Sequence, residues 1–197
     1  MAGPADRAEA VGILSLAFQN DPALTWIIPD ADHRRARLPL LFETLFKSDL
    51  KAGKVVLSGS GEACALWRAP GVAEAGATEM LRHAIPLLRI FGSGLGRGIA
   101  VSKALDAHRP RNIPFWYLHF VGVHPDFQGQ GWGGDIIREG LKRADADGQP
   151  TYLETATPQN VPLYLRLGFS IINEWDVPKG GPHFWSMLRD VGGARPA

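Results

Sequence analysis

Residues Val121 to Gly134, which read V-G-V-H-P-D-F-Q-G-Q-G-W-G-G, decide the fold of this chain. An apolar run from Phe115 to Val123 leads into them, and its aromatic and β-branched side chains are typical of a strand. Pro125 ends that strand because it has no N–H to donate to the ladder. Four glycines follow within six residues. Apolar side chains then recur at helical spacing, at Ile136, Ile137, Leu141 and Ala144. The stretch therefore predicts a strand, a glycine-rich loop and a helix in direct succession.

A glycine-rich loop in this position is suited to bind phosphate groups. The N–H groups in the first turn of a helix have no partner within the helix, and the macrodipole adds partial positive charge there. Glycines let the backbone approach an anion without a Cβ in the way. We therefore predict that a pyrophosphate binds to Gly129–Gly134.

The residues of this loop fit more than one kind of ligand that contains a pyrophosphate. Gly129-x-Gly131-x-x-Gly134 satisfies the dinucleotide fingerprint of nicotinamide enzymes, with Glu154 near the position of the ribose-binding acid. The position of the loop argues against this interpretation. Too little chain follows the first helix to supply the remaining strands of a dinucleotide-binding sheet.

A second motif favours another cofactor. The residues Leu153-Glu-Thr-Ala-Thr-Pro-Gln-Asn160-Val-Pro-Leu-Tyr164-Leu-Arg-Leu-Gly-Phe169 resemble the strand, Asn-bearing turn and Tyr-bearing helix of the GCN5-related N-acetyltransferases (GNAT). Gln128-x-x-Gly131-x-Gly133 resembles the acetyl-CoA loop of the same family. Within the family, the likeness to the puromycin N-acetyltransferase group runs over almost the whole chain. It includes Ala17-Phe18, Asp21-Pro22, Gly53-Lys54-Val55, His108-Arg109-Pro110, Leu153-Glu154-Thr155 and Val177-Pro178.

The resemblance implies an α/β fold with a mostly antiparallel central sheet, helices on both faces and a splayed pair of strands at the acetyl-CoA cleft. It also implies direct acetyl transfer from the CoA thioester to the amine of a small molecule, antibiotics included, with no metal. The residues that would hold acetyl-CoA are Val121, Gly122, Val123, Gln128, Gly129, Gln130, Gly131, Trp132, Gly133, Gly134 and Asn160. Val121 and Val123 would act through their main chain, and one strand N–H would face the thioester oxygen.

Two residues are predicted to be catalytic. Tyr164 is the proton donor that the resemblance implies, and a phenol with a pKa near ~10 is protonated at neutral pH. Glu154 is the predicted general base, acting through a water, with His119 on the signature strand as its rival. Asn160 precedes a helix, so a helix N-cap is a second role for it. Other histidines lack converging partners, and we predict no metal site.

The acceptor amine is expected to lie against the first helix and the loop that follows it. Phe18, Asp21 and Trp26 are the predicted contacts, with His119 as a further one, because an aromatic wall and one carboxylate suit an amine on an apolar body. Closing the edge of the core is the alternative role of Phe18 and Trp26. A non-catalytic acyl-CoA-binding or sensor domain is the alternative function.

Composition narrows the class of protein. A chain of 197 residues predicts a single domain over residues 1–197. The net charge is +1 with acidic and basic residues interleaved, so neither nucleic acid nor an anionic membrane is an expected partner. No apolar run approaches the length of a membrane span, and no signal peptide is predicted. The lone cysteine, Cys64, suits a reducing cytoplasm and a buried strand.

The remaining pattern predicts further elements. Helices are expected over Asp6–Gln19, His33–Leu50, with Pro39 kinking or beginning it, and Thr78–Phe91. A hairpin is expected over Lys54–Ser58 and Ala63–Arg68. Later elements are a strand at Pro150–Thr155, a helix at Asn160–Leu167 and strands at Ser170–Val177 and His183–Leu188. The glycine run Gly92–Gly98 is interpreted as a mobile link over the acceptor site rather than a further phosphate loop, because no strand precedes it.

Overall fold

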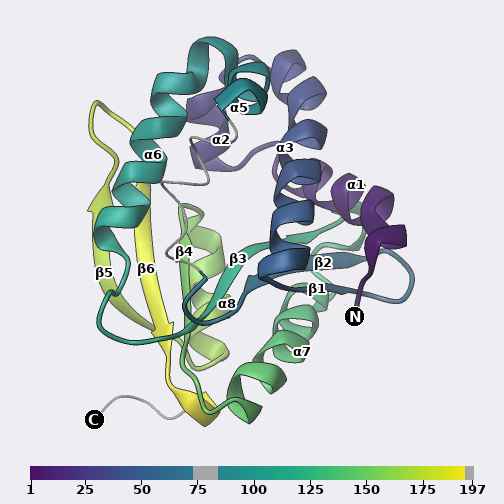
Figure 1. Cartoon of the computed structure of the whole chain (residues 1–197), viewed down its shortest axis with the longest axis vertical. Helices are drawn as coiled ribbons and strands as arrows, with labels where there is room; N and C mark the ends of the chain where they lie inside the picture. Colours follow the sequence, from purple (N-terminus) through teal and green to yellow (C-terminus); the bar gives the residue numbers. More distant parts are fainter. Residues whose placement is uncertain (73–83, 194–197) are drawn as a thin grey trace.

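The computed structural model describes residues 1–72 and 84–193, and a central sheet organises them (Figure 1). In this part of the chain the sheet has six strands in the order β1-β2-β3-β4-β6-β5. The strands are β1 (Gly53–Leu57), β2 (Ala63–Arg68), β3 (Trp116–Val123), β4 (Thr151–Thr155), β5 (Ser170–Asp176) and β6 (His183–Arg189). Neighbouring strands run antiparallel except β3 and β4, which are parallel. The predicted mostly antiparallel sheet is confirmed.

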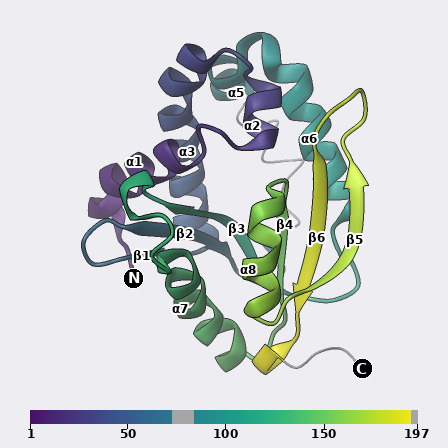
Figure 2. The ribbon, with the colours of Figure 1, turned by 180° about the vertical axis from the view of Figure 1, so that it is seen from behind.

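Helices cover both faces of this sheet. The α-helices are α1 (Arg7–Ala17), α2 (Pro22–Ile27), α3 (Ala31–Ala52), α5 (Ala84–Phe91), α6 (Leu95–His108), α7 (Trp132–Ala146) and α8 (Val161–Arg166). Short 3₁₀ turns lie at Pro4–Asp6, Gly92–Gly94, Pro125–Phe127, Pro158–Asn160 and Val191–Gly193. Figure 1 shows α3 and α6 in front of the sheet, and Figure 2 shows α7 and α8 on the opposite face.

Each face of the sheet carries its own hydrophobic core because side chains alternate along a strand. On β2, Leu66 packs with α1 and α3, while its neighbour Trp67 packs on the other side with α7. The Trp67 ring lies so close to Gly140 that a Cβ at that position would be 2.0 Å from the ring. Helix α7 therefore needs a glycine there to approach the sheet.

The central strands β3 and β4 part soon after they begin. They pair only at Trp116 with Thr151 and at Tyr117 with Tyr152, whereas β3 continues to Val123. On its other edge β3 stays paired with β2, although the register skips His119 between Leu118 and Phe120. An extra residue of this kind bends a strand and increases its twist. The result is the predicted splay, which opens toward the carboxyl ends of both strands.

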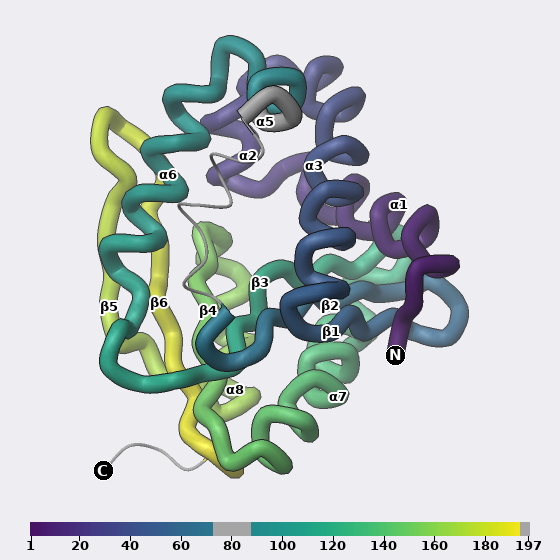
Figure 3. The backbone as a smooth tube through the Cα atoms, in the orientation of Figure 1, coloured from purple at the N-terminus to yellow at the C-terminus, as the bar shows by residue number. Residues whose placement is uncertain are grey.

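Helices α2, α5 and α6 lie together at one end of the molecule, between α3 and the β5–β6 pair (Figure 3). The link predicted for Gly92–Gly98 is shorter than expected, because a 3₁₀ turn at Gly92–Gly94 joins α5 to α6 and the rest of the segment is the first turn of α6, where Leu95 and Gly98 line a cavity. The glycines of this segment allow close packing. A Cβ at Gly94 would be 2.1 Å from the carbonyl oxygen of Ile27, and one at Gly98 would be 3.2 Å from the Phe91 ring.

Most predicted elements match the structure within a few residues. Pro39 lies inside α3 and does not begin it. The residues around Trp26 form α2, which Asp21 caps. Part of the helix predicted for Thr78–Phe91 lies outside the described residues, and α5 is the part within them. Among the described helices, none is both long and apolar enough to cross a membrane.

Candidate active site

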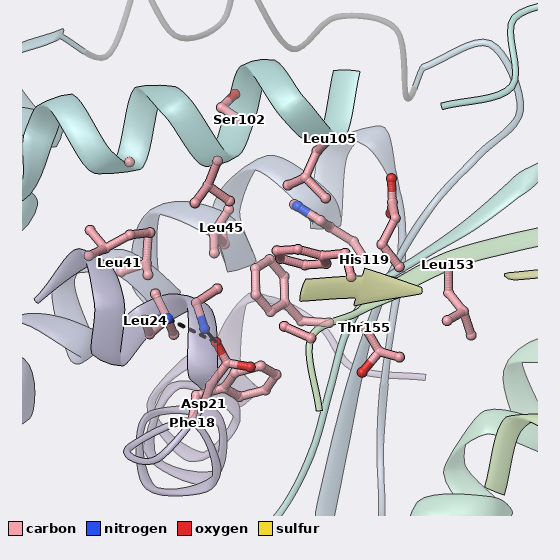
Figure 4. A pocket seen from close by; sticks show the side chains of 18 of the residues that line it. Phe18, Asp21, Leu24, Leu41, Leu45, Ser102, Leu105, His119, Leu153 and Thr155 are labelled. Carbon is pink, nitrogen blue, oxygen red and sulfur yellow. Dashed lines mark hydrogen bonds between the residues drawn. The ribbon is translucent and has the colours of Figure 1, made fainter. Parts of the chain in front are cut away.

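One cavity lies where β3 and β4 part, and it has a volume of about 340 Å³. Its lining comes from α2, α3, α5 and α6 on one side and from β3, β4 and α8 on the other. Figure 4 shows side chains from the helices and from the strands turned toward one another across this space. A volume of this order is typical of a small-molecule site.

The glycine loop has the geometry of an anion site at the start of a fifteen-residue helix. Gly129 and Gly131 have positive φ angles of 76° and 92°, which glycine adopts without strain. The N–H groups of Gly134 and Asp135 bond to the Gly131 carbonyl. Within the described chain, the N–H groups of residues 129–133 have no protein acceptor. These N–H groups and the helix dipole together suit a pyrophosphate.

The loop lies beside the end of β3 and the start of α8. A Cβ at Gly133 would touch Val123 at 3.5 Å and Leu163 at 3.7 Å. The side-chain amide of Gln128 donates to the Val123 carbonyl at 3.2 Å, which ties the loop to the strand that leads into it. The predicted anion loop therefore lies next to the open edge of β3.

The main chain of β3 faces this opening at alternate residues. The N–H of His124 donates to the Glu62 carbonyl at 2.8 Å, so residue 124 points toward β2. Because N–H and C=O groups alternate in direction along a strand, those of Val121 and Val123 point toward the side that β4 has left. Gly122 pairs with Cys64, and a Cβ on it would lie 2.9 Å from that of Ala17. Strand β3 thus offers main-chain groups that a bound chain can pair with.

Tyr164 and Asn160 lie at α8, on the far side of the splay. Tyr164 is buried, and its ring packs edge-on against Phe169 with centroids 5.9 Å apart. Burial, and then the negative charge of Asp21, raise the pKa of Tyr164 above its usual value, so the hydroxyl stays protonated at neutral pH. Asn160 occupies the N-cap position, but its side chain makes no capping hydrogen bond. Both residues line the cavity.

Glu154 lines the cavity from β4, with Arg109 and the hydroxyls of Tyr117 and Tyr152 nearby. Both carboxylate oxygens of Glu154 are buried without a well-formed hydrogen bond. Burial raises the pKa of Glu154. Arg109 and the hydroxyls of Tyr117 and Tyr152 lower it, although they do not outweigh burial. The Tyr152 hydroxyl is itself committed to Ser186, at 3.1 Å.

His119 lines the cavity from β3 and belongs to a buried hydrogen-bonded chain with Asp49 and Arg68. Its Nδ1 lies 2.6 Å from one carboxylate oxygen of Asp49, and the other oxygen accepts from Arg68 Nε, also at 2.6 Å. Burial lowers the pKa of His119 in spite of Asp49, so the imidazole is neutral at pH 7. A neutral ring that donates from Nδ1 has an unprotonated Nε2 that can accept a proton.

Sequence reasoning missed Asp49 and Arg68. Asp49 lies 70 residues before His119, and no spacing rule connects the two. One signal was available, because Asp49 continues the apolar face of its helix, following Leu45 by four residues and Phe46 by three. A charged residue on an apolar face needs a partner across the core.

The predicted acceptor residues divide into two groups. Phe18 lines the cavity and packs against the rings of Phe42 and Phe120, with centroids 5.3 Å and 5.4 Å away. Asp21 also lines it, and one of its oxygens accepts from the N–H groups of Ala23 and Leu24 at 3.0 Å and 2.9 Å (Figure 4). Trp26 is not among the lining residues and packs against the core instead.

Comparison with known proteins places this geometry in a family. A family model described as "Acetyltransferase (GNAT) family" matches residues 98–169, a span that contains β3, the glycine loop, α7, β4 and α8. An uncharacterised N-acetyltransferase of Schizosaccharomyces pombe is 26% identical over 174 residues, which are 83% of this chain and 70% of the relative.

Solved structures agree with the observed fold. A structure from Corynebacterium glutamicum, described as histone acetyltransferase HPA2 and related acetyltransferase, is 30% identical with a TM-score of 0.71. The match covers 100% of this chain and 96% of that one. Arylalkylamine N-acetyltransferase 2 from Aedes aegypti has a TM-score of 0.70 at 14% identity, with 97% of each chain covered, and shows the shared fold.

Proposed function

This chain belongs to the acetyltransferase (GNAT) family, and we propose that it transfers the acetyl group of acetyl-CoA directly to the amine of a small molecule. One observation carries the proposal. Glu154, His119 and Tyr164 converge on a single cavity, and the splayed edge of β3 borders that cavity.

The donor side of the site fits acetyl-CoA. The free N–H groups of residues 129–133 would bind its pyrophosphate, with Gln128 holding the loop against β3. The main chains of Val121 and Val123 would pair with the pantetheine arm, as would the uncommitted Asn160 side chain. Bound acetyl-CoA supplies the acetyl group as an activated thioester. A strand N–H facing the thioester oxygen would stabilise the charge that develops there.

Proton transfer is assigned to two side chains in the cavity. Glu154 takes a proton from the acceptor ammonium, through a water, which leaves the amine neutral and nucleophilic. Its raised pKa suits this role because a base works best when its pKa lies near the working pH. The Tyr164 hydroxyl holds a proton for the departing thiolate. His119 is the second candidate base. The pH profiles of kcat/KM for the E154Q and H119Q variants show which of the two side chains takes the proton.

The acceptor site is proposed to lie over Phe18, Asp21 and His119, on the helical side of the cavity. Trp26 has no place in this proposal because it does not line the cavity. The resemblance to the puromycin N-acetyltransferase group makes an aminonucleoside antibiotic one acceptor to test. Polyamines, aminoglycosides and short peptides complete the panel.

Tyr164→Phe tests the function most directly, because the change removes one hydroxyl and keeps the ring in its core. We expect acetyl-CoA to bind with unchanged affinity in calorimetry, while amine-dependent thiol release falls by about 10²-fold or more. Leu165→Ala, at an exposed position of the same helix, is the matched control and should keep its activity. Negligible turnover by the wild type with every amine, together with tight acetyl-CoA binding, would instead identify a binding or sensor domain.

A further inference from the structure

The two sides of the cavity differ in chemistry. Its helical side is built from aliphatic side chains of α2, α3, α5 and α6. The chief ones are Leu24, Ile27, Leu41, Leu45, Ile90 and Leu105. In Figure 4, Leu24, Leu41 and Leu45 lie together on the side away from Leu153 and Thr155. The strand side carries Glu154 and His119, whereas the helical side also holds Asp21, at the start of α2, and Asp106, in α6.

Polar groups on the helical side already have partners. The Thr44 hydroxyl donates to the Leu40 carbonyl of its own helix at 2.9 Å. Ser48 accepts from Arg68 at 3.4 Å, and Ser102 is engaged as well. A polar or charged ligand group on this side would therefore lose its water and gain no replacement hydrogen bond, which is costly.

Carboxylates in the lining differ in whether they are committed. Among the described residues that line the cavity, the acidic ones are Asp21, Asp106 and Glu154. Asp21 caps α2 through two main-chain N–H groups, and Asp106 pairs with Arg109 at 3.0 Å. Glu154 alone of these three has buried oxygens with no well-formed hydrogen bond. A buried acceptor without a well-formed hydrogen bond, on a residue that lines a cavity, indicates a ligand that brings the donor.

We propose that the acceptor is a primary monoamine with an uncharged, apolar body. Its ammonium binds to Glu154, and its body fills the aliphatic side formed by α2, α3, α5 and α6. A second positive charge on the acceptor would be desolvated among leucine and isoleucine side chains, where Asp21 and Asp106 are already bonded to protein groups, so polyamines and aminoglycosides are excluded. This inference names the acceptor class of the proposed function and rests on it.

A matched series of amines tests the class. Thiol release from acetyl-CoA is measured with linear monoamines from butylamine to octylamine and with diamines of the same lengths. Each added methylene in the monoamines should raise kcat/KM about fourfold until the cavity is full. Each diamine should be poorer than its monoamine by about tenfold or more.

Thr44→Asp adds a further carboxylate on the helical side, one that is not already committed as Asp21 and Asp106 are. Thr44 lines the cavity from the middle of α3 and is partly exposed, so aspartate fits without disturbing the core. This variant should raise kcat/KM for 1,6-diaminohexane relative to hexylamine by about tenfold. Thr44→Asn has the same shape without the charge and should leave that ratio at its wild-type value.

The outcomes separate this inference from the function on which it rests. Two results together support the apolar monoamine class. Activity rises with the length of the monoamine, and Thr44→Asp raises kcat/KM for 1,6-diaminohexane relative to hexylamine. Diamines, aminoglycosides or peptides acetylated as well as octylamine would overturn the class and leave the acetyltransferase function standing. Absence of thiol release with every amine, while acetyl-CoA binds in calorimetry, would overturn the proposed function itself.

Discussion

Two buried carboxylates near the same cavity are held in opposite ways. Asp49 has a partner on each oxygen, His119 on one and Arg68 on the other, both at 2.6 Å. Neither oxygen of Glu154 has a well-formed hydrogen bond, although Arg109, Tyr117 and Tyr152 lie close enough to lower its pKa. Hydrogen bonds to both oxygens stabilise the charged form of a buried carboxylate. A buried carboxylate without such bonds costs free energy until a donor binds to it.

This difference predicts different roles for Asp49 and Glu154. Asp49 is fully buried and fixes the tautomer and orientation of His119, so its contribution is to the shape of the cavity wall. The unsatisfied carboxylate of Glu154 is a stability cost that a folded protein keeps only at a functional site. We therefore expect changes at Glu154 to affect turnover and changes at Asp49 to affect folding.

Glu154→Gln should give the largest effect on turnover. It removes the proposed base and keeps the shape of the side chain, so kcat/KM for an amine acceptor should fall by roughly 10²–10⁴-fold. The midpoint of thermal unfolding should rise, because a buried, unpartnered charge is gone. Glu174→Gln, at an exposed position on β5, is the control. Wild-type turnover in the Glu154 variant would contradict the proposed role.

Asp49→Asn should give the largest effect on folding. It removes the negative charge that faces the buried Arg68, and breaking a buried ion pair costs about 3–5 kcal/mol of unfolding free energy. Urea denaturation at pH 7 measures the loss. The double variant Asp49→Leu, Arg68→Met removes both charges and should recover much of it. A loss below about 1 kcal/mol in the single variant would mean that the pair is not a structural anchor.

The pH dependence of stability should have opposite signs at the two sites. Burial raises the folded pKa of Glu154, so the folded chain keeps a proton that the unfolded chain loses. This contribution to stability falls as pH rises above the ordinary value of 4.5. Burial lowers the folded pKa of His119 below 6.5, so its contribution falls as pH drops below that value.

Denaturation from pH 4 to 9 checks both signs. The stability gain of Glu154→Gln over the wild type should grow as pH rises, and that of His119→Gln should grow as pH falls. Each slope is limited to about 1.4 kcal/mol per pH unit for one proton. Parallel curves for a variant and the wild type would mean that the residue has the same pKa in the folded and unfolded states.

Tyr152→Phe should give the smallest effect. The Tyr152 hydroxyl donates to Ser186, which also accepts from the indole N–H of Trp175 at 3.0 Å, so Ser186 keeps one partner. Loss of one hydrogen bond costs about 1 kcal/mol of unfolding free energy. Turnover should change less than threefold, because the Tyr152 hydroxyl is bonded to Ser186 and lowers the pKa of Glu154 less than Arg109 and Tyr117 do. A tenfold loss of kcat/KM would instead place Tyr152 among the groups that support Glu154.

The donor side of the site could be predicted from the sequence because its features are local. Glycine at 129 and 131, the strand before them and the helix after them lie within one continuous stretch, and each follows from backbone chemistry. Glu154, Asn160 and Tyr164 belong to a second continuous motif, and the structure brings all three to the cavity.

The remaining features depend on tertiary contacts, which a local sequence pattern does not show. The partnership of Asp49 with His119 links a helix to a strand 70 residues away. The glycine-rich composition of Gly92–Gly98 indicated a mobile segment. Gly94 and Gly98 nevertheless lie where α6 packs closely on Ile27 and Phe91. Trp26 had a plausible pattern for a ligand contact and points into the core instead. In each case the deciding neighbour lies outside the local sequence window.

We propose above all that an acetyl group passes from acetyl-CoA to an apolar amine in this cavity. The most direct measurement incubates the wild-type protein with acetyl-CoA and octylamine and follows free thiol together with the mass of the amine. We predict one N-acetylated octylamine for each thiol released, with none formed by Glu154→Gln on the same timescale. Tight binding of acetyl-CoA without any acetylated amine would contradict the claim.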